Sequence, residues 1–109
     1  DPLLTGTLGY WPKGKAKQRT DIDLGLRNKS ELTIGKGISC DIPINDPTLE
    51  DIHVKIKANR QADRSIIIEI EPLGETKKNF TKLDATEQIE DETEYFVGQT
   101  VLKYTKQLL

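Results

Sequence analysis

The chain has 109 residues, a length that predicts a single domain with its own hydrophobic core and without need of a metal or disulfide. Sixteen Lys and Arg residues against 18 Asp and Glu leave a net charge of −2, so no overall basic field favours nucleic acid or an anionic membrane surface. Cys40 is the only cysteine, and no apolar run is long enough to span a membrane, which favours an intracellular protein. The absence of Met and the start at Asp1 favour one domain, residues 1–109, cut from a longer protein.

The first quarter of the chain is predicted to form two strands. Residues 3–11 are rich in leucine and aromatic side chains and predict a strand that ends at Pro12. The basic segment 13–20 is expected to be a solvated loop. Apolar residues alternate with polar or small ones over 22–26 and predict a second strand, which the polar residues 28–30 turn back.

The central stretch alternates apolar runs with residues typical of turns. A strand is predicted over 32–34, and the two glycines of 35–37 break it where the backbone turns sharply. Period-2 alternation over 42–44 and 54–56 predicts two further strands with one face on a core. Between them, Asn45-Asp46-Pro47-Thr48 has the composition of a turn.

The second half contains the most β-branched run in the chain. Residues 65–70 include four isoleucines and predict a central strand that is buried on both faces or nearly so. A turn over 98–100 joins strands predicted over 95–97 and 101–104, and residues 106–109 are expected to begin a short helix or to fray. About ten to eleven short strands without a long helical period predict an all-β protein, an antiparallel β-sandwich.

The side chains supply few parts for catalysis. One His, one Cys and scattered carboxylates offer no nucleophile–base pair, no Cys/His metal set and no glycine-rich phosphate loop that opens a helix. We therefore expect no enzyme activity, no cofactor, no metal site and no small-molecule substrate. His53, beside an apolar strand, is expected to be structural, and Cys40 to be a small buried side chain.

The order of residues in the central stretch resembles the forkhead-associated (FHA) domain, whose pattern runs Gly-Arg, Asp-Ile, Asp and Ser-Arg-x-His. The spacing is matched here by Gly35-Lys36, Asp41-Ile42, Asp46 and Glu50-Asp51-Ile52-His53. Asn79 and Thr81 resemble the family's Asn-Gly-Thr motif, and 95–104 its final hairpin, so the resemblance covers nearly the whole chain. It implies a sandwich of the SMAD/FHA type and an intracellular protein, with the nucleus favoured over the cytoplasm.

The resemblance also implies roles for individual residues. Gly35 and His53 would be structural, with His53 bracing the recognition loops. Lys36 and Glu50 stand where FHA domains use Arg and Ser to hold phosphothreonine, and Asn79 where an Asn holds the peptide backbone. The candidate peptide-binding face consists of six polar loop residues: Lys36, Ser39, Glu50, Asp51, Asn79 and Thr81.

The chemistry of these positions opposes phosphate binding. A phosphate dianion needs donors and positive charge, but Glu50 and Asp51 are anionic, and Lys36 lacks the planar fork of Arg. Two unit charges about 4 Å apart interact by ~1 kcal/mol in water and ~4 kcal/mol near a protein surface, and a phosphate roughly doubles this. Repulsion therefore exceeds the ~1.5–3 kcal/mol of one charged hydrogen bond from Lys36.

The leading hypothesis is a non-catalytic, phosphate-independent interaction module whose partner is another protein or a peptide, phosphorylated or basic. One alternative is a phosphothreonine-peptide reader in a signalling, DNA-damage or cell-cycle protein. Another is an architectural domain that packs within a larger assembly and has no separate peptide ligand. Neither a membrane nor nucleic acid is an expected partner.

Overall fold

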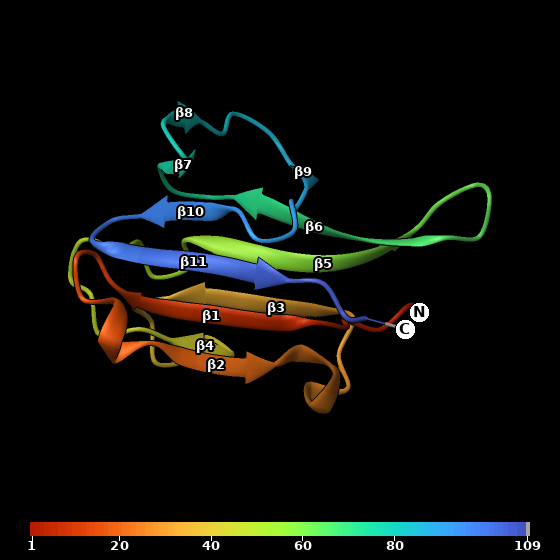
Figure 1. Cartoon of the computed structure of the whole chain (residues 1–109), viewed down its shortest axis with the longest axis horizontal. Helices are drawn as coiled ribbons and strands as arrows, with labels where there is room; N and C mark the ends of the chain where they lie inside the picture. Colours follow the sequence, from red (N-terminus) through yellow and green to blue (C-terminus); the bar gives the residue numbers. More distant parts are fainter. Residues whose placement is uncertain (109) are drawn as a thin grey trace.

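The computed structural model describes residues 1–108, which form two β-sheets packed face to face (Figure 1). The six-stranded sheet contains β2 (Thr20–Asp23), β1 (Thr7–Pro12), β11 (Thr100–Thr105), β10 (Glu94–Val97), β7 (Thr76–Lys78) and β8 (Thr81–Lys82), in that order. The five-stranded sheet contains β4 (Ile42–Pro43), β3 (Glu31–Gly35), β5 (Val54–Arg60), β6 (Ile66–Pro72) and β9 (Glu87–Gln88). The predicted β-sandwich is confirmed.

The core lies between the two sheets and is built by alternate residues of the strands. In β3 and β5, Leu32, Ile34, Val54 and Ile56 are fully buried, while the residues between them face outward. Tyr95 of β10 is fully buried in the core from the other sheet, and its hydroxyl accepts a hydrogen bond from the N–H of Glu90 at 2.9 Å.

The strand predicted over 22–26 is wrong beyond Asp23. The chain turns there into a short 3₁₀ helix, η2 (Leu24–Arg27), because the Asp23 carboxylate accepts a hydrogen bond from the N–H of Gly25 at 3.0 Å. Leu24 stays buried, but Leu26 is 83% exposed. The basic segment also contains a 3₁₀ turn, η1 (Ala16–Gln18). No helix within residues 1–108 is long and apolar enough to cross a membrane.

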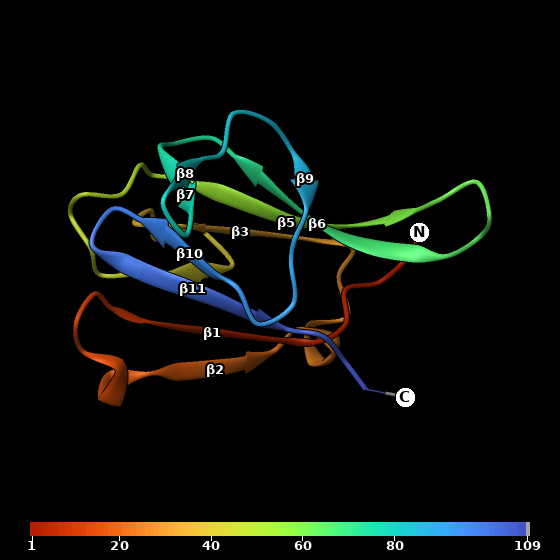
Figure 2. The ribbon, with the colours of Figure 1, turned by 45° about the horizontal axis from the view of Figure 1, so that its top comes forward.

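The isoleucine-rich strand is present as β6, but its expected burial on both faces is wrong. Ile68 and Ile70 point into the core, whereas Ile66 is 45% exposed. Figure 2 shows the reason: the β5–β6 hairpin projects beyond the neighbouring strands, so its outer part has no sheet to cover it. The β9 neighbour pairs with only Glu69 and Ile70.

The two ends of the sandwich differ in the strand ends and loops that lie there. At one end, Thr7 of β1 pairs with Thr105 of β11, so the first and last strands begin and finish side by side. At the other end, Pro12 pairs with Thr100, and most interstrand loops gather there (Figure 1). The β3–β4 pair is parallel, unlike its neighbours. Residues 106–108 form no helix, and the last residue of the predicted one, Leu109, lies outside the described residues.

Candidate functional site

Three loops meet at the loop-rich end of the sandwich: the β3–β4 loop (36–41), the β4–β5 loop (44–53) and the β6–β7 loop (73–75). The first two are joined through their backbones. The N–H of Lys36 donates to the carbonyl of Glu50 at 3.1 Å, and the N–H of Gly37 donates to that of Asp51 at 3.0 Å. The structure therefore brings Lys36, Glu50 and Asp51 together on adjacent loops.

Gly35 is what permits this approach. A Cβ at that position would overlap the carbonyl oxygen of Asp51, so a side chain would force the two loops apart. The buried Cys40 adds a further link, because its Sγ lies 2.9 Å from the same carbonyl oxygen. The structure thus uses Cys40 in packing, as expected of a small buried side chain.

His53 joins the β4–β5 loop to the β6–β7 loop. Its Nδ1 accepts a hydrogen bond from the N–H of Glu50 at 3.0 Å, which requires Nδ1 to be unprotonated. The proton is therefore on Nε2, which donates to the carbonyl of Glu75 at 2.8 Å. The ring is 3% exposed and packs against Gly74, where an added Cβ would lie 2.6 Å from its Cε1. Both ring nitrogens of His53 are therefore engaged in hydrogen bonds to the backbone of these loops.

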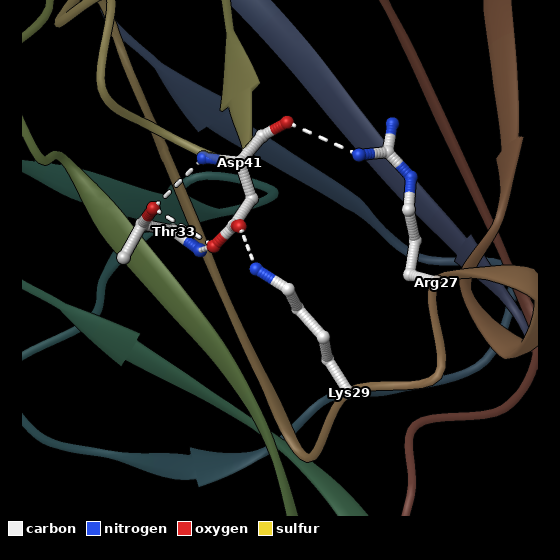
Figure 3. Close-up of polar contacts among 4 residues, drawn as sticks. All are labelled: Arg27, Lys29, Thr33 and Asp41. Atoms are coloured by element: carbon white, nitrogen blue, oxygen red, sulfur yellow. Dashed lines mark hydrogen bonds and ion pairs between the residues drawn. The ribbon is translucent and has the colours of Figure 1, made fainter.

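Asp41 holds the far end of the β3–β4 loop (Figure 3). Its Oδ2 accepts hydrogen bonds from the N–H and the hydroxyl of Thr33 at 2.9 and 3.1 Å, and Oδ1 forms an ion pair with Lys29. The Asp41 carbonyl also accepts from Arg27 at 3.3 Å. The hydrogen bond from Lys29 is the main cause that lowers the pKa of Asp41, outweighing the opposite effect of burial, and the Thr33 bonds add to it.

Asp46 ties the β4–β5 loop to the other sheet. One carboxylate oxygen accepts from the N–H and hydroxyl of Thr48, and the other from the N–H of Gln99 and the hydroxyl of Thr100, at 2.6–2.9 Å. Burial raises the pKa of Asp46, but these hydrogen bonds together outweigh it and leave the pKa lowered. The three loops therefore rest on a rigid, hydrogen-bonded base.

The three loops are acidic, whereas the β1–β2 loop, which follows Pro12 at the same end, carries the exposed cations Lys13, Lys15 and Lys17. Lys36, Ser39, Glu50 and Asp51 are all exposed, and the β6–β7 loop adds the exposed carboxylate of Glu75. Within residues 1–108, none of these charged side chains forms an ion pair. Glu75 is not among the six predicted residues, because Pro72-Leu73-Gly74 before it indicates the end of a strand without showing which loop the next residues contact.

Asn79 and Thr81 lie elsewhere, in the β7–β8 hairpin. Asn79 and Phe80 form its two-residue turn between the paired Lys78 and Thr81, and Asn79 has a φ of 53°. No hydrogen bond within the described part of the chain joins Asn79 or Thr81 to Lys36, Glu50 or Asp51. A groove of about 390 Å³ runs between the two regions, with His53 and Glu75 at one end and Asn79 at the other. Residues 1–108 contain no cluster of His, Cys, Asp and Glu that could hold a metal ion.

No protein-family model and no curated protein matches the chain. Solved structures do match. The yeast splicing factor Pml1 aligns with a TM-score of 0.79 at 15% identity over 94% of this chain and 80% of that one. The FHA domain of CT664 from Chlamydia trachomatis aligns with a TM-score of 0.73 at 15% identity, over 94% and 99% of the two chains.

The chain has the fold of an FHA domain. A third structure, the MEK1 FHA domain in complex with a HOP1 phosphothreonine peptide, covers 96% of this chain and 100% of that one, with a TM-score of 0.68 and 12% identity. The likeness extends over the two sheets and the loops that join them.

Proposed function

We propose that this FHA-like chain is a non-catalytic module that binds a protein or peptide at its loop end without requiring phosphate. The observation that carries the proposal is the charge of the three loops: Glu50, Asp51 and Glu75 stand on hydrogen-bonded loops on which Lys36 is the one Lys or Arg. A phosphate dianion placed among three carboxylates would be repelled, whereas a neutral or basic segment would not.

Apolar side chains on the same loops support an interaction surface. Ile38 is 98% exposed at the tip of the β3–β4 loop, and Ile52 and Leu73 are 40% and 48% exposed on the other two loops. Loops held on a rigid scaffold are common binding elements, and neighbouring exposed apolar side chains are typical of protein contacts. The base formed by Asp41, Asp46 and His53 holds these loops in place.

The test compares phosphorylated and unphosphorylated versions of the same peptides. A library of threonine-containing peptides is screened against the purified domain by fluorescence anisotropy, in matched pairs that differ only in the phosphate. We expect peptides to bind, and we expect phosphorylation to leave affinity unchanged or to lower it. Binding that disappears after phosphatase treatment of the peptide would overturn the proposal.

A second candidate is a phosphothreonine reader like the MEK1 FHA domain, which is bound to a phosphothreonine peptide of HOP1. Lys36 favours it, because its exposed ammonium group forms no ion pair within residues 1–108 and lies where the resemblance places a phosphate-binding Arg. The matched library separates the two candidates. An architectural role would instead appear as an absence of binding to either version.

A further inference from the structure

The groove between the loop end and the β7–β8 turn lies on the outer face of the six-stranded sheet. Phe96 of β10 and Lys77 of β7 are paired in register, and both side chains point away from the core, since their neighbours Tyr95 and Val97 point into it. With a volume of about 390 Å³, the groove is large enough to take apolar side chains of a peptide.

The groove has aromatic walls. Phe96 lies under the ammonium group of Lys13, whose Nζ is 5.9 Å from the ring centroid. Phe80 lines the other end and is 96% exposed. Two-residue turns favour Gly or Asn, so the turn itself gives no reason for an aromatic residue at this position. A large exposed aromatic side chain beside a groove is typical of a binding contact.

Opposite charges occupy different parts of this surface. The loop end carries the carboxylates of Glu50, Asp51 and Glu75, and the groove carries the ammonium groups of Lys13 and Lys77. Within residues 1–108 neither lysine forms an ion pair, so both are available to an anionic partner. A ligand that spans the surface would match it with a cation at the loops and an anion in the groove.

We infer that the loop end and this groove together bind one extended, unphosphorylated peptide that carries a basic residue at the loops, then an acidic residue beside Lys13 and Lys77, and then an apolar side chain against Phe80. The inference rests on the proposed function and adds the chemistry of the partner to it. An extended chain is required because the surface runs along β7 toward the β7–β8 turn.

The experiment uses a display library of random, unphosphorylated peptides selected on the whole 109-residue chain. We expect the selected peptides to share the order basic, acidic, apolar. The affinity of a selected peptide is then measured on Phe80→Ser and Lys77→Glu, which alter exposed residues of the groove. Both should weaken binding about tenfold or more. Leu26→Ser and Lys106→Glu are the matched controls, since both residues are exposed and lie outside the groove, and they should leave affinity within about twofold.

The outcomes separate the two proposals. If selected peptides bind without phosphate but bind Phe80→Ser and Lys77→Glu as tightly as the unchanged chain, the groove inference is wrong and the proposed function stands. Equal affinity for a peptide with its basic and acidic residues exchanged would also overturn the inference. If no peptide is selected above background, both proposals fail. Circular dichroism of each variant confirms that the fold is retained.

Discussion

Asp46 in the β4–β5 loop accepts a 2.7 Å hydrogen bond from the hydroxyl of Thr100, the first residue of β11 in the opposite sheet. The pair joins residues far apart in sequence, and the same carboxylate oxygen also accepts the N–H of Gln99. This buried carboxylate therefore holds the β4–β5 loop, which contains Glu50 and Asp51, against the start of β11.

Replacing Asp46 with Ala should destabilise the domain by about 2–4 kcal/mol, because four donors would lose a charged acceptor at a site that is 7% exposed. Urea unfolding followed by Trp11 fluorescence measures the change. Thr48→Val removes only one of these donors, the Thr48 hydroxyl, and should cost less. An unfolding midpoint equal to that of the unchanged protein would show that the network contributes no stability.

Stability should fall in acid partly because of Asp41. Its pKa in the folded state is lowered, chiefly by the hydrogen bond from Lys29, so the carboxylate binds a proton more readily in the unfolded chain. The contribution is fully present above the unfolded pKa of about 3.9 and is lost as the pH falls through the lower folded value. Asp41→Asn should therefore be less stable at neutral pH and show a smaller loss of stability between about pH 5 and pH 2. Parallel curves of unfolding free energy against pH would contradict this expectation.

The isoleucines of β6 should differ sharply in their contribution to the free energy of unfolding. Ile70 is fully buried, and Ile70→Ala should cost about 2–5 kcal/mol of unfolding free energy through lost burial and the cavity left behind. Ile68→Ala should fall in the same range. Ile66→Ala, at a position that is 45% exposed on the projecting hairpin, is the control and should cost less than about 1 kcal/mol. A similar midpoint shift for all three would mean that the hairpin is covered in solution.

Gly35→Ala should be more damaging than Gly37→Ala. A Cβ at Gly35 overlaps the Asp51 carbonyl, whereas one at Gly37 would lie 3.0 Å from the same atom. We expect Gly35→Ala to cost about 2–4 kcal/mol and to separate the β3–β4 and β4–β5 loops. Thermal unfolding measures the cost, and amide exchange at Lys36 and Gly37 reports the loop contact. Equal protection of these amides in both variants would show that the backbone adjusts without opening.

Changing Lys36→Arg, Glu50→Ser and Asp51→Arg together should create phosphopeptide binding. The three changes replace repulsion with a bidentate donor, a hydroxyl and a second cation on loops whose backbone positions are already fixed. Titration with phosphothreonine peptides measures the gain, and the single change Lys36→Arg is the control that should show little. Adding Phe80→Gly tests whether the exposed ring obstructs the peptide. Failure of both combined variants would mean that charge is not what prevents phosphate binding.

The sandwich could be predicted from sequence because period-2 alternation is strong in the buried strands, such as Leu32 to Ile34 in β3. Prediction failed where the alternation was short. Leu24 and Leu26 fit a strand pattern equally well, and the 3₁₀ turn that replaces it depends on the capping hydrogen bond of Asp23. It also failed at Ile66, since composition carries no information on how far a hairpin projects beyond its sheet.

The candidate site was predictable only in part. The spacing from Lys36 to His53 placed two loops that the structure joins by backbone hydrogen bonds. Glu75 escaped notice because its position depends on the contact of its carbonyl with His53, a relationship between residues distant in sequence. The groove beside Phe96 escaped for a similar reason, since it is created by the register of β7 against β10.

The pairing of Thr7 with Thr105 has a mechanical consequence. The first and last strands, β1 and β11, leave the sandwich at the same end, so a force that pulls residues 1–6 away from residues 106–108 would separate β1 from β11 one residue pair at a time. Such peeling loads few hydrogen bonds at once. Under tension the domain would therefore open from this end, and the binding loops, at Pro12 and Thr100, would be the last part of that strand pair to feel the load.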